Sequence, residues 1–354
     1  MNSEQRRIFR ELRVDHIRFY VADIDTKVAE LVQSYGFDIY ANAIDQSDEQ
    51  SVAMGKDQIR LVLTRALVDD HPGTVYLTRH GDGVADIALG TTDAPVAFAE
   101  AVRRGACPVG EPVEREGTIT ASVLGFGDVL HTFVQRRRGT KARHLPGFVP
   151  QRDGIAAIDS GLLAVDHFAV CLEAGQLEPT VEFYEQVLDF RMTFTEQIIV
   201  GSQAMNSKVV QSASGAVTLT LIEPDTGREP GQVDEFVKNH GGAGVQHIAF
   251  ETANIVHSVR VLRSSGIEFL NIPDVYYSLL ADRLELTRHS AADLGELNIL
   301  ADEDHVGQLF QIFTKSVHPR ATLFFEVIER VGATTFGSGN IKALYEAVEA
   351  ERIG

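Results

Sequence analysis

The sequence predicts an α+β fold made of tandem βαβββ units, grouped into two domains of the same design. The first reason is length, because 354 residues exceed what one hydrophobic core usually serves. The second is periodicity, because segments with strand-like alternation are followed by segments with helical spacing. The third is repetition, because these segments recur in the same order in both halves of the chain.

The clearest repeat opens each half. Residues 14–21 and 165–172 both begin with Val-Asp-His and alternate as a strand does. A helical stretch follows the first strand and ends near Gly36, and another follows the second strand over residues 178–187. Each half therefore starts with a strand, a helix and a turn into further strands.

Two more pairs of segments continue the repeat. Residues 83–89 match residues 244–250, and a helical stretch follows each of them. A third pair sets residues 127–133 against residues 307–313. The repeat thus extends through both halves.

These repeats divide the chain into a first domain over residues 1–140 and a second domain over residues 161–354. The segment between them, residues 141–160, contains scattered Gly and Pro and is predicted to be a linker. The second domain ends in a stretch with helical periodicity, residues 341–352, which we expect to form a lid helix over an open cup.

Composition excludes several classes of function. A net charge of −18 and a pI of about 5.1 argue against nucleic acid or an anionic membrane as a partner. Cys107 and Cys171 cannot build a disulfide framework or a thiolate zinc site, and two lone thiols suit a reducing compartment. No signal peptide is recognisable, and no apolar run reaches the roughly 18 residues of a membrane span. We therefore expect a cytoplasmic protein.

Three residues of the second half are candidate metal ligands. His167 and His247 lie in the two strands that open its two units, and Glu326 lies in an apolar stretch, Leu-Phe-Phe-Glu-Val-Ile. A buried carboxylate needs a cation to offset its lost hydration. Two histidines and one carboxylate are the usual ligands of non-haem Fe(II) oxygenases, and they leave positions free for substrate and O2. The sequence therefore predicts an Fe(II) site.

Each of these residues also has a simpler interpretation. A lone histidine in an apolar strand is more often a hydrogen-bonded core residue, and Glu326 could pair with Arg330. The coincidence of three ligands at repeat-equivalent places favours the metal. The first half retains His16, but Asp86 stands at the second position and we find no glutamate at the third. We therefore expect that half to be a metal-free scaffold with His16 as a core residue.

Other motifs carry less weight. Residues 302–305, Asp-Glu-Asp-His, cannot all face one ion because they are consecutive, so we interpret them as a solvated loop. The sequence contains no GxGxxG, P-loop, GxSxG or HExxH motif, so nucleotide-binding, serine-hydrolase and zincin functions lack support.

Tandem units of this kind resemble the vicinal-oxygen-chelate fold, in which curved sheets enclose a cup, and the resemblance covers nearly the whole chain. The fold hosts dioxygenases, glyoxalases, isomerases and metal-free binding proteins, so it does not fix the chemistry. The second half also resembles the family of 4-hydroxyphenylpyruvate dioxygenases and 4-hydroxymandelate synthases. The blocks that carry this resemblance are Val165-Asp166-His167, Phe183-Tyr184-Glu185, Gly244-Val245-Gln246-His247-Ile248-Ala249-Phe250, Gln311-Ile312-Phe313-Thr314-Lys315, Thr322-Leu323-Phe324-Phe325-Glu326, Phe336-Gly337-Ser338-Gly339-Asn340 and Lys342-Ala343-Leu344.

The family resemblance implies an Fe(II)-dependent dioxygenase that takes 4-hydroxyphenylpyruvate and O2 and releases CO2 by oxidative decarboxylation. One branch then hydroxylates the ring and forms homogentisate, and the other hydroxylates the benzylic carbon and forms 4-hydroxymandelate. The second product is a precursor of hydroxyphenylglycine in antibiotic biosynthesis. Homodimeric assembly is a further expectation from the fold family.

Departures from the homogentisate-forming pattern indicate the branch. Ile222 stands where that pattern has Asn, Ile341 where it has Phe, and Tyr345 where it has another Phe. Branched apolar side chains in these places would reshape the pocket, and the position of hydroxylation depends on geometry at the ångström scale. The sequence therefore favours 4-hydroxymandelate as the product, with homogentisate as the alternative and a metal-free aromatic-binding protein as a third reading.

The resemblance also implies roles for pocket residues. Gln311 is expected near the keto acid, and Ser207 and Thr220 near polar ends of the substrate. Tyr345 is expected to close the cup and reach the phenol. The remaining substrate-binding positions are expected to be wall residues: Ile222, Phe325, Phe336 and Ile341.

Overall fold

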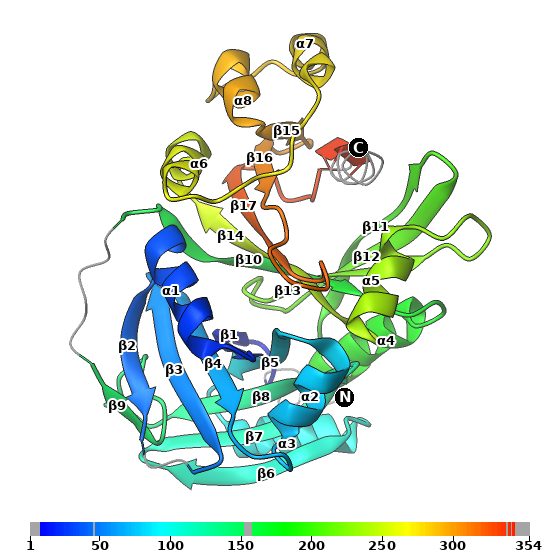
Figure 1. Cartoon of the computed structure of the whole chain (residues 1–354). Coiled ribbons are helices and arrows are strands. Elements are labelled where there is room, and N and C mark those ends of the chain that lie inside the picture. Colours follow the sequence, from blue (N-terminus) through cyan, green and yellow to red (C-terminus); the bar gives the residue numbers. More distant parts are fainter. Residues whose placement is uncertain (1–7, 45–46, 152–157, 338, 341, 344–354) are drawn as a thin grey trace.

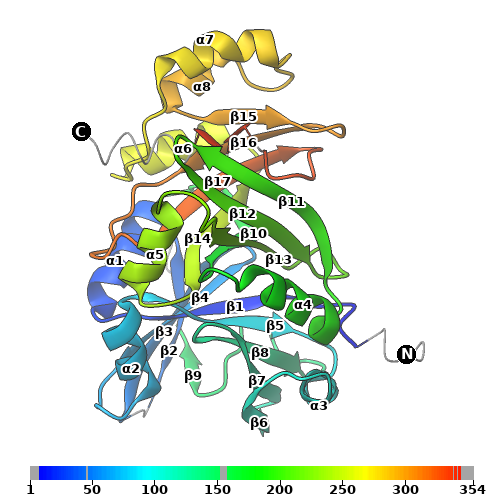
Figure 2. The ribbon, with the colours of Figure 1, turned by 90° about the vertical axis from the view of Figure 1, so that its right-hand side faces the viewer.

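The computed structural model describes residues 8–44, 47–151, 158–337, 339–340 and 342–343. Two curled, mixed sheets lie one above the other, the first from the N-terminal half and the second from the C-terminal half (Figures 1 and 2). Helices pack on both sheets, and α2 with α5 and α3 with α4 meet between the two halves. This confirms the α+β fold of tandem units with cup-like sheets.

The first sheet has the strand order β6-β7-β8-β5-β1-β4-β3-β2-β9. The elements of this half are β1 (Arg13–Tyr20), α1 (Ile24–Tyr35), β2 (Asp38–Ala43), β3 (Glu49–Lys56), β4 (Ile59–Ala66), α2 (Pro72–His80), β5 (Gly83–Gly90), α3 (Ala94–Arg103), β6 (Pro108–Arg115), β7 (Thr118–Phe126), β8 (Val129–Arg136) and β9 (Phe148–Pro150).

The second sheet has the strand order β11-β12-β13-β10-β14-β17-β16-β15. Its elements are β10 (Leu162–Cys171), α4 (Leu177–Leu188), β11 (Arg191–Val200), β12 (Gln203–Gln211), β13 (Thr218–Pro224), α5 (Gln232–His240), β14 (Gly244–Thr252), α6 (Ile255–Ser264), α7 (Asp274–Arg283), α8 (Ala291–Leu297), β15 (Leu300–Glu303), β16 (Gln308–Phe313) and β17 (Phe324–Val331).

The repeat is visible in the middle of each sheet. An antiparallel pair, β1 with β5 or β10 with β14, forms the centre. A parallel neighbour flanks this pair on each side: β4 and β8 in the first sheet, β13 and β17 in the second. The two halves therefore share one design, as the sequence predicts.

This topology corrects the third sequence pair. Because β8 runs parallel to β5 as β17 runs parallel to β14, the counterpart of β17 is β8, and β16 corresponds to β7. The sequence comparison set residues 127–133 against residues 307–313 and was therefore wrong by one strand. Neighbouring antiparallel strands share the same period-two pattern, so the pattern alone does not distinguish them.

The segment predicted as a linker contains a strand. Within its described part, β9 pairs with β2 at the edge of the first sheet. Three residues are too few to produce a recognisable alternation, which explains why the sequence did not indicate it. We retain the division at residues 141–160 as a proposal, with β9 assigned to the first domain.

Local sequence explains where α1 begins and where the first helix of each half ends. The side chain of Asp23 caps α1 by accepting a hydrogen bond from the backbone N–H of Thr26 at 3.1 Å. That helix ends at Gly36, whose φ of 71° suits glycine. The corresponding helix α4 ends at Asp189 with a φ of 56°, a conformation that aspartate tolerates better than most residues.

Aromatic residues join the two halves in one core. Tyr35 packs edge-on against Phe325 with ring centroids 5.2 Å apart, and Phe37 packs against Phe250 at 6.0 Å. Phe250 in turn lies 5.1 Å from Phe325. These contacts place the strand that carries Glu326 directly over the first domain. Within the described residues, no helix combines the length and apolar character needed to span a membrane.

Candidate metal centre

The three candidate ligands lie on adjacent central strands of the second sheet. His167 is on β10 and Glu326 is on β17, and both stand opposite Ala249 of the strand between them, β14. His247 lies two residues before Ala249, so its side chain points to the same face of the sheet. The sheet order therefore brings together residues that are far apart in the sequence.

The three side chains converge on one point. Nε2 of His167 lies 3.4 Å from Oε2 of Glu326, and Nε2 of His247 lies 3.2 Å from the same oxygen. One ligand atom from each residue falls within 4.8 Å of the others, and all three residues are buried. In the part of the chain that the structure describes, no other group of three such residues meets this geometry. Two imidazoles and one carboxylate on one side of an ion fit a facial Fe(II) site.

Electrostatics favours a charged carboxylate at this position. Burial alone would raise the pKa of Glu326, but His167 and His247 outweigh this effect and hold it at about 2. Burial lowers the pKa of His167, yet Glu326 and Asp166 raise it to about 9. Burial lowers the pKa of His247 in spite of Glu326. The centre thus combines a buried negative charge with two nitrogens that bind a cation when deprotonated.

A second layer of contacts orients His167. Its Nδ1 lies 2.8 Å from Oδ1 of Asp166, which leaves Nε2 to face the centre. Arg330 donates to both oxygens of Asp166, from Nε at 2.7 Å and from Nη2 at 2.9 Å. Arg330 therefore pairs with Asp166, so its proposed pairing with Glu326 in the simpler interpretation was wrong.

The other oxygen of Glu326 is also engaged. Nε2 of Gln311 donates to Oε1 of Glu326 at 2.8 Å, and Nδ2 of Asn340 donates to Oε1 of Gln311 at 2.9 Å. Because this chain of hydrogen bonds occupies Oε1, Oε2 remains directed at the two histidines. Gln311 therefore contacts the ligand directly, which the sequence reasoning did not specify.

A small cavity opens beside the three ligands. The predicted pocket residues that line it are Ser207 on β12, Thr220 and Ile222 on β13, Gln311 on β16, and Phe336. The sequence reasoning missed two apolar wall residues, Ile198 on β11 and Phe313 on β16. Alternation could have found Phe313, because it lies two residues after Gln311 and shares its face.

The structure contradicts the expected place of Phe325. This residue precedes Glu326 in β17, so its side chain points to the opposite face of the sheet. There it packs against Tyr35 and Phe250 between the two halves. Phe325 is therefore a core residue, whereas Phe336 lies in the cavity and packs edge-on against His167, with ring centroids 5.1 Å apart. Ile341, Tyr345 and most of the expected lid helix lie outside the described residues.

The acidic run at residues 302–305 was predicted to be a loop, but its first two residues end β15, and the run has a structural role. Asp304 accepts hydrogen bonds from the backbone N–H groups of Thr334 and Thr335, at 2.7 and 2.9 Å. Asp302 accepts another from the N–H of Gly339 at 2.9 Å. These bonds hold the segment that carries Phe336 and Asn340 against the cup.

The first half repeats the Asp–His and Asp–Arg contacts that lie behind the metal ligands, but it lacks two of the three ligands. Asp15 lies 2.8 Å from Nδ1 of His16 and forms an ion pair with Arg136, as Asp166 does with His167 and Arg330. Asp86 replaces the second histidine, and the register of β5 with β8 puts Thr132 in the place of Glu326. Thr132 donates to Asp86 through its backbone N–H at 3.0 Å and through its hydroxyl. His16 is buried, but it lines a cavity, so its interpretation as a core residue was incomplete.

Comparison with known proteins identifies the family of the chain. Residues 164–287 match the model of the Glyoxalase/Bleomycin resistance protein/Dioxygenase superfamily. The fold and the convergent side chains thus define the class as a vicinal-oxygen-chelate protein with a candidate metal site. More particularly, the chain belongs to the 4-hydroxyphenylpyruvate dioxygenase family, whose cofactor is Fe(II).

The relatives match over almost their whole length. The chain is 34% identical to 4-hydroxyphenylpyruvate dioxygenase of Dictyostelium discoideum, over 96% of this chain and 97% of that protein. It is 34% identical to the enzyme of the same name from Xenopus tropicalis, over 97% and 92%. It is 42% identical to a solved mutant of 4-hydroxymandelate synthase from Streptomyces coelicolor, with a TM-score of 0.87 over 96% and 98% of the two chains.

The contact between Asp166 and His167 predicts a specific loss of iron affinity. We expect Asp166→Asn to weaken Fe(II) binding by about 10- to 100-fold, because the imidazole loses the charge that orients it and strengthens it as a ligand. The matched control is Asp15→Asn, which breaks the equivalent ion pair in the first half. Anaerobic Fe(II) titration of both variants measures the effect, and equal losses in the two would refute the specific role of Asp166.

The raised pKa of His167 predicts a pH dependence. Without metal this imidazole is protonated below pH of about 9, so Fe(II) must displace a proton to bind. Apparent iron affinity should therefore rise by about tenfold per pH unit from neutral pH and level off above the pKa. Competition with a chelator under argon measures this slope, and an affinity independent of pH between 7 and 8.5 would contradict it.

Proposed function

We propose that this enzyme converts 4-hydroxyphenylpyruvate and O2 to 4-hydroxymandelate and CO2, by oxidative decarboxylation and benzylic hydroxylation. The atoms balance, because the substrate's carboxylate leaves as CO2 and both oxygens of O2 enter 4-hydroxymandelate, one in its new carboxylate and one as the benzylic hydroxyl. The observation that carries the choice of product is Ile222, which lines the cavity beside the ligands where homogentisate-forming relatives are expected to have Asn. The 42% identity to a 4-hydroxymandelate synthase supports the same choice.

The proposed metal ligands are His167, His247 and Glu326. Bound there, Fe(II) would supply coordination positions for the keto acid and for O2. Gln311 would act as a positioning residue, since its amide occupies Oε1 of Glu326 and leaves Oε2 for the ion. Asp166 would keep His167 in the tautomer that presents Nε2.

Polar groups of the cavity would bind the substrate. The hydroxyl oxygen of Thr220 is buried and has no hydrogen-bond partner among the described residues. A buried hydroxyl without a partner is costly, so a substrate oxygen that meets it would gain binding energy. Ser207 is buried on the neighbouring strand, opposite Ile222, and offers a second hydroxyl. We assign these two residues to the polar ends of the substrate and Tyr345 to the phenol.

Apolar walls would direct the reaction. Ile198, Ile222, Phe313 and Phe336 surround the ligands and leave little room for water. Exclusion of water protects reactive species, and branched side chains restrict how the aromatic ring can lie. With Ile222 and Ile341 in place of Asn and Phe, we propose that the benzylic carbon is held nearest to the metal.

The remaining proposals follow from this one. An enzyme that makes 4-hydroxymandelate would serve the synthesis of hydroxyphenylglycine for antibiotics. We also propose that the enzyme is a cytoplasmic homodimer.

The alternative function is that of a homogentisate-forming enzyme, which the names of the relatives at 34% identity favour. A metal-free binding protein has no need for a buried carboxylate between two imidazoles.

Product identification tests the proposed function. The Fe(II)-loaded enzyme is given 4-hydroxyphenylpyruvate, O2 uptake and CO2 release are recorded, and the product is identified by NMR. We expect 4-hydroxymandelate as the main product. Homogentisate as the main product would refute the choice of branch while leaving the dioxygenase activity established.

A double variant tests the role of the pocket. We expect Ile222→Asn combined with Ile341→Phe to shift at least about a tenth of the product toward homogentisate, because the reshaped wall would let the ring approach the metal. The control is Ile199→Asn, which places the same polar group on an exposed position of β11. Chromatography of both reactions measures the ratio of products, and an unchanged ratio in the double variant would contradict the pocket argument.

A further inference from the structure

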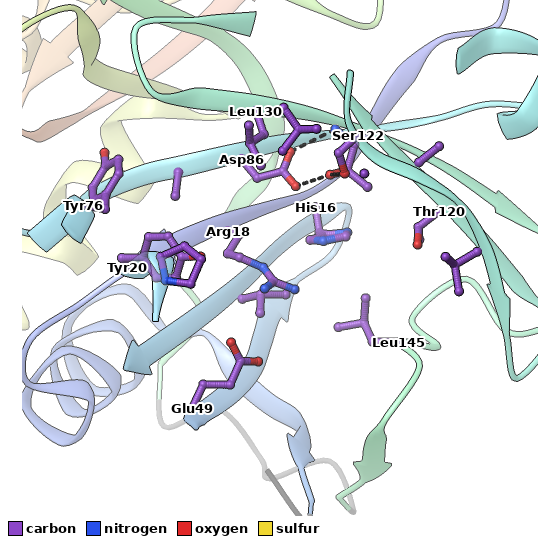
Figure 3. Close-up of a pocket in the computed structure, with 18 of the residues that line it drawn as sticks. His16, Arg18, Tyr20, Glu49, Tyr76, Asp86, Thr120, Ser122, Leu130 and Leu145 are labelled. Atoms are coloured by element: carbon purple, nitrogen blue, oxygen red, sulfur yellow. Dashed lines mark hydrogen bonds between the residues drawn. The ribbon is translucent and has the colours of Figure 1, made fainter. Parts of the chain in front are cut away.

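The first domain contains a second, larger cup. A cavity of about 1000 Å³ opens on the concave face of the first sheet, at the position that corresponds to the metal centre of the second. Figure 3 shows His16, Arg18 and Asp86 on its inner wall. Pockets that bind small molecules have volumes of roughly 300–1,000 Å³. The cavity is therefore large enough for a ligand, and the proposed reaction does not use it.

Arg18 is the unusual residue of this cup. Its side chain extends from β1 into the cavity (Figure 3), and its Nε is buried without a hydrogen-bond partner. No ion pair joins Arg18 to any residue within the described ranges. A partly buried guanidinium is stabilised by an anion, and Arg18 forms no ion pair with a described carboxylate.

The nearby acids are already engaged. Glu49 accepts hydrogen bonds from His71 and Ser51, at 3.1 and 3.2 Å. Asp86 accepts two hydrogen bonds from Thr132, and burial raises its pKa despite them. The charges of His16 and Arg18 oppose this rise, but Asp86 and Arg18 form no ion pair with each other. Arg18 therefore faces the cavity without an ion pair, while both nearby carboxylates are hydrogen-bonded to other residues.

The walls around this charge are largely apolar. Val62, Leu130 and Leu145 line the cavity together with the rings of Tyr20 and Tyr76. Charged residues of both signs also line it, but they are exposed and their charges are screened by solvent. These exposed residues are Asp70, Arg79, Glu111, Arg115 and Asp128. One inner cation among apolar and aromatic walls suits a ligand with one acid group and an apolar body.

We propose that the cup of the first domain is a second binding site, specific for a small organic carboxylate with an aromatic or other apolar body. The carboxylate pairs with the guanidinium of Arg18, whose planar fork matches its two oxygens. The apolar body lies against Leu130, Leu145 and Tyr20. Binding at this site needs no metal, because Asp86 and Thr132 replace two of the three ligands.

The test uses a probe with the required chemistry and no keto group. We choose 4-hydroxyphenylacetate and compare it with its amide, which has the same shape and no charge. Equilibrium dialysis of the Fe(II)-loaded enzyme under argon counts the sites on each chain. We expect Arg18→Met to weaken binding of the acid at one site by at least about tenfold. We also expect the wild type to bind the amide no more tightly than Arg18→Met binds the acid.

Two further variants control the result. Arg65→Met removes an exposed arginine of β4 outside the cavity, so it should leave the isotherm unchanged. Thr120→Phe narrows the cavity and retains Arg18, so it should weaken binding of the apolar body without removing the charge. Turnover of 4-hydroxyphenylpyruvate and thermal stability should persist in Arg18→Met, since it removes an unpaired charge. Identical isotherms for the wild type and Arg18→Met would overturn the proposal.

Discussion

The charge of Glu326 is the constraint on which the second domain depends. This carboxylate is 1% exposed, so it requires partners that replace its lost hydration. Three neighbouring strands supply them: His167 from β10, His247 from β14 and Gln311 from β16. Each partner can reach Glu326 only if the strands lie in this order and register. The cost of burying one charge therefore links the topology of the sheet to the geometry of the metal site.

Much of the fold and all three candidate ligands could be predicted from the sequence, because alternation and repetition are local signals. His167 and His247 sit at matching places in strands that repeat, and Glu326 interrupts an apolar strand. It was harder to predict on which face of the sheet a given side chain lies, as Phe325 shows. Family resemblance identifies a position in the sequence but not the direction in which its side chain points. The sequence also did not predict the short strand β9, because three residues show no recognisable alternation. It matched β8 with the wrong strand of the second half, because adjacent strands share the same alternation.

The contacts behind the ligands could not be predicted from the same signals. Arg330 and Asp166 are 164 positions apart, and they meet only because β10 and β17 flank the same strand. Asn340 reaches Gln311 because Asp302 and Asp304 hold the intervening segment in place. Such pairs depend on sheet order and loop path, which a linear pattern does not contain. They nevertheless decide which atom of each ligand faces the ion.

The ion pair of Asp15 with Arg136 separates two properties that coincide in the second domain. Both domains tie a histidine-bearing strand to a strand two places away through an Asp–Arg pair, yet among the described residues only the second domain groups three side chains that could hold a metal. The pair is therefore a brace of the sheet first, and an aid to metal binding only where ligands are present. In this architecture a few side chains determine the chemistry, and the sheet that bears them keeps its fold when other side chains take their place. A protein with two such sheets can keep one cup for catalysis while the residues that line the other cup change.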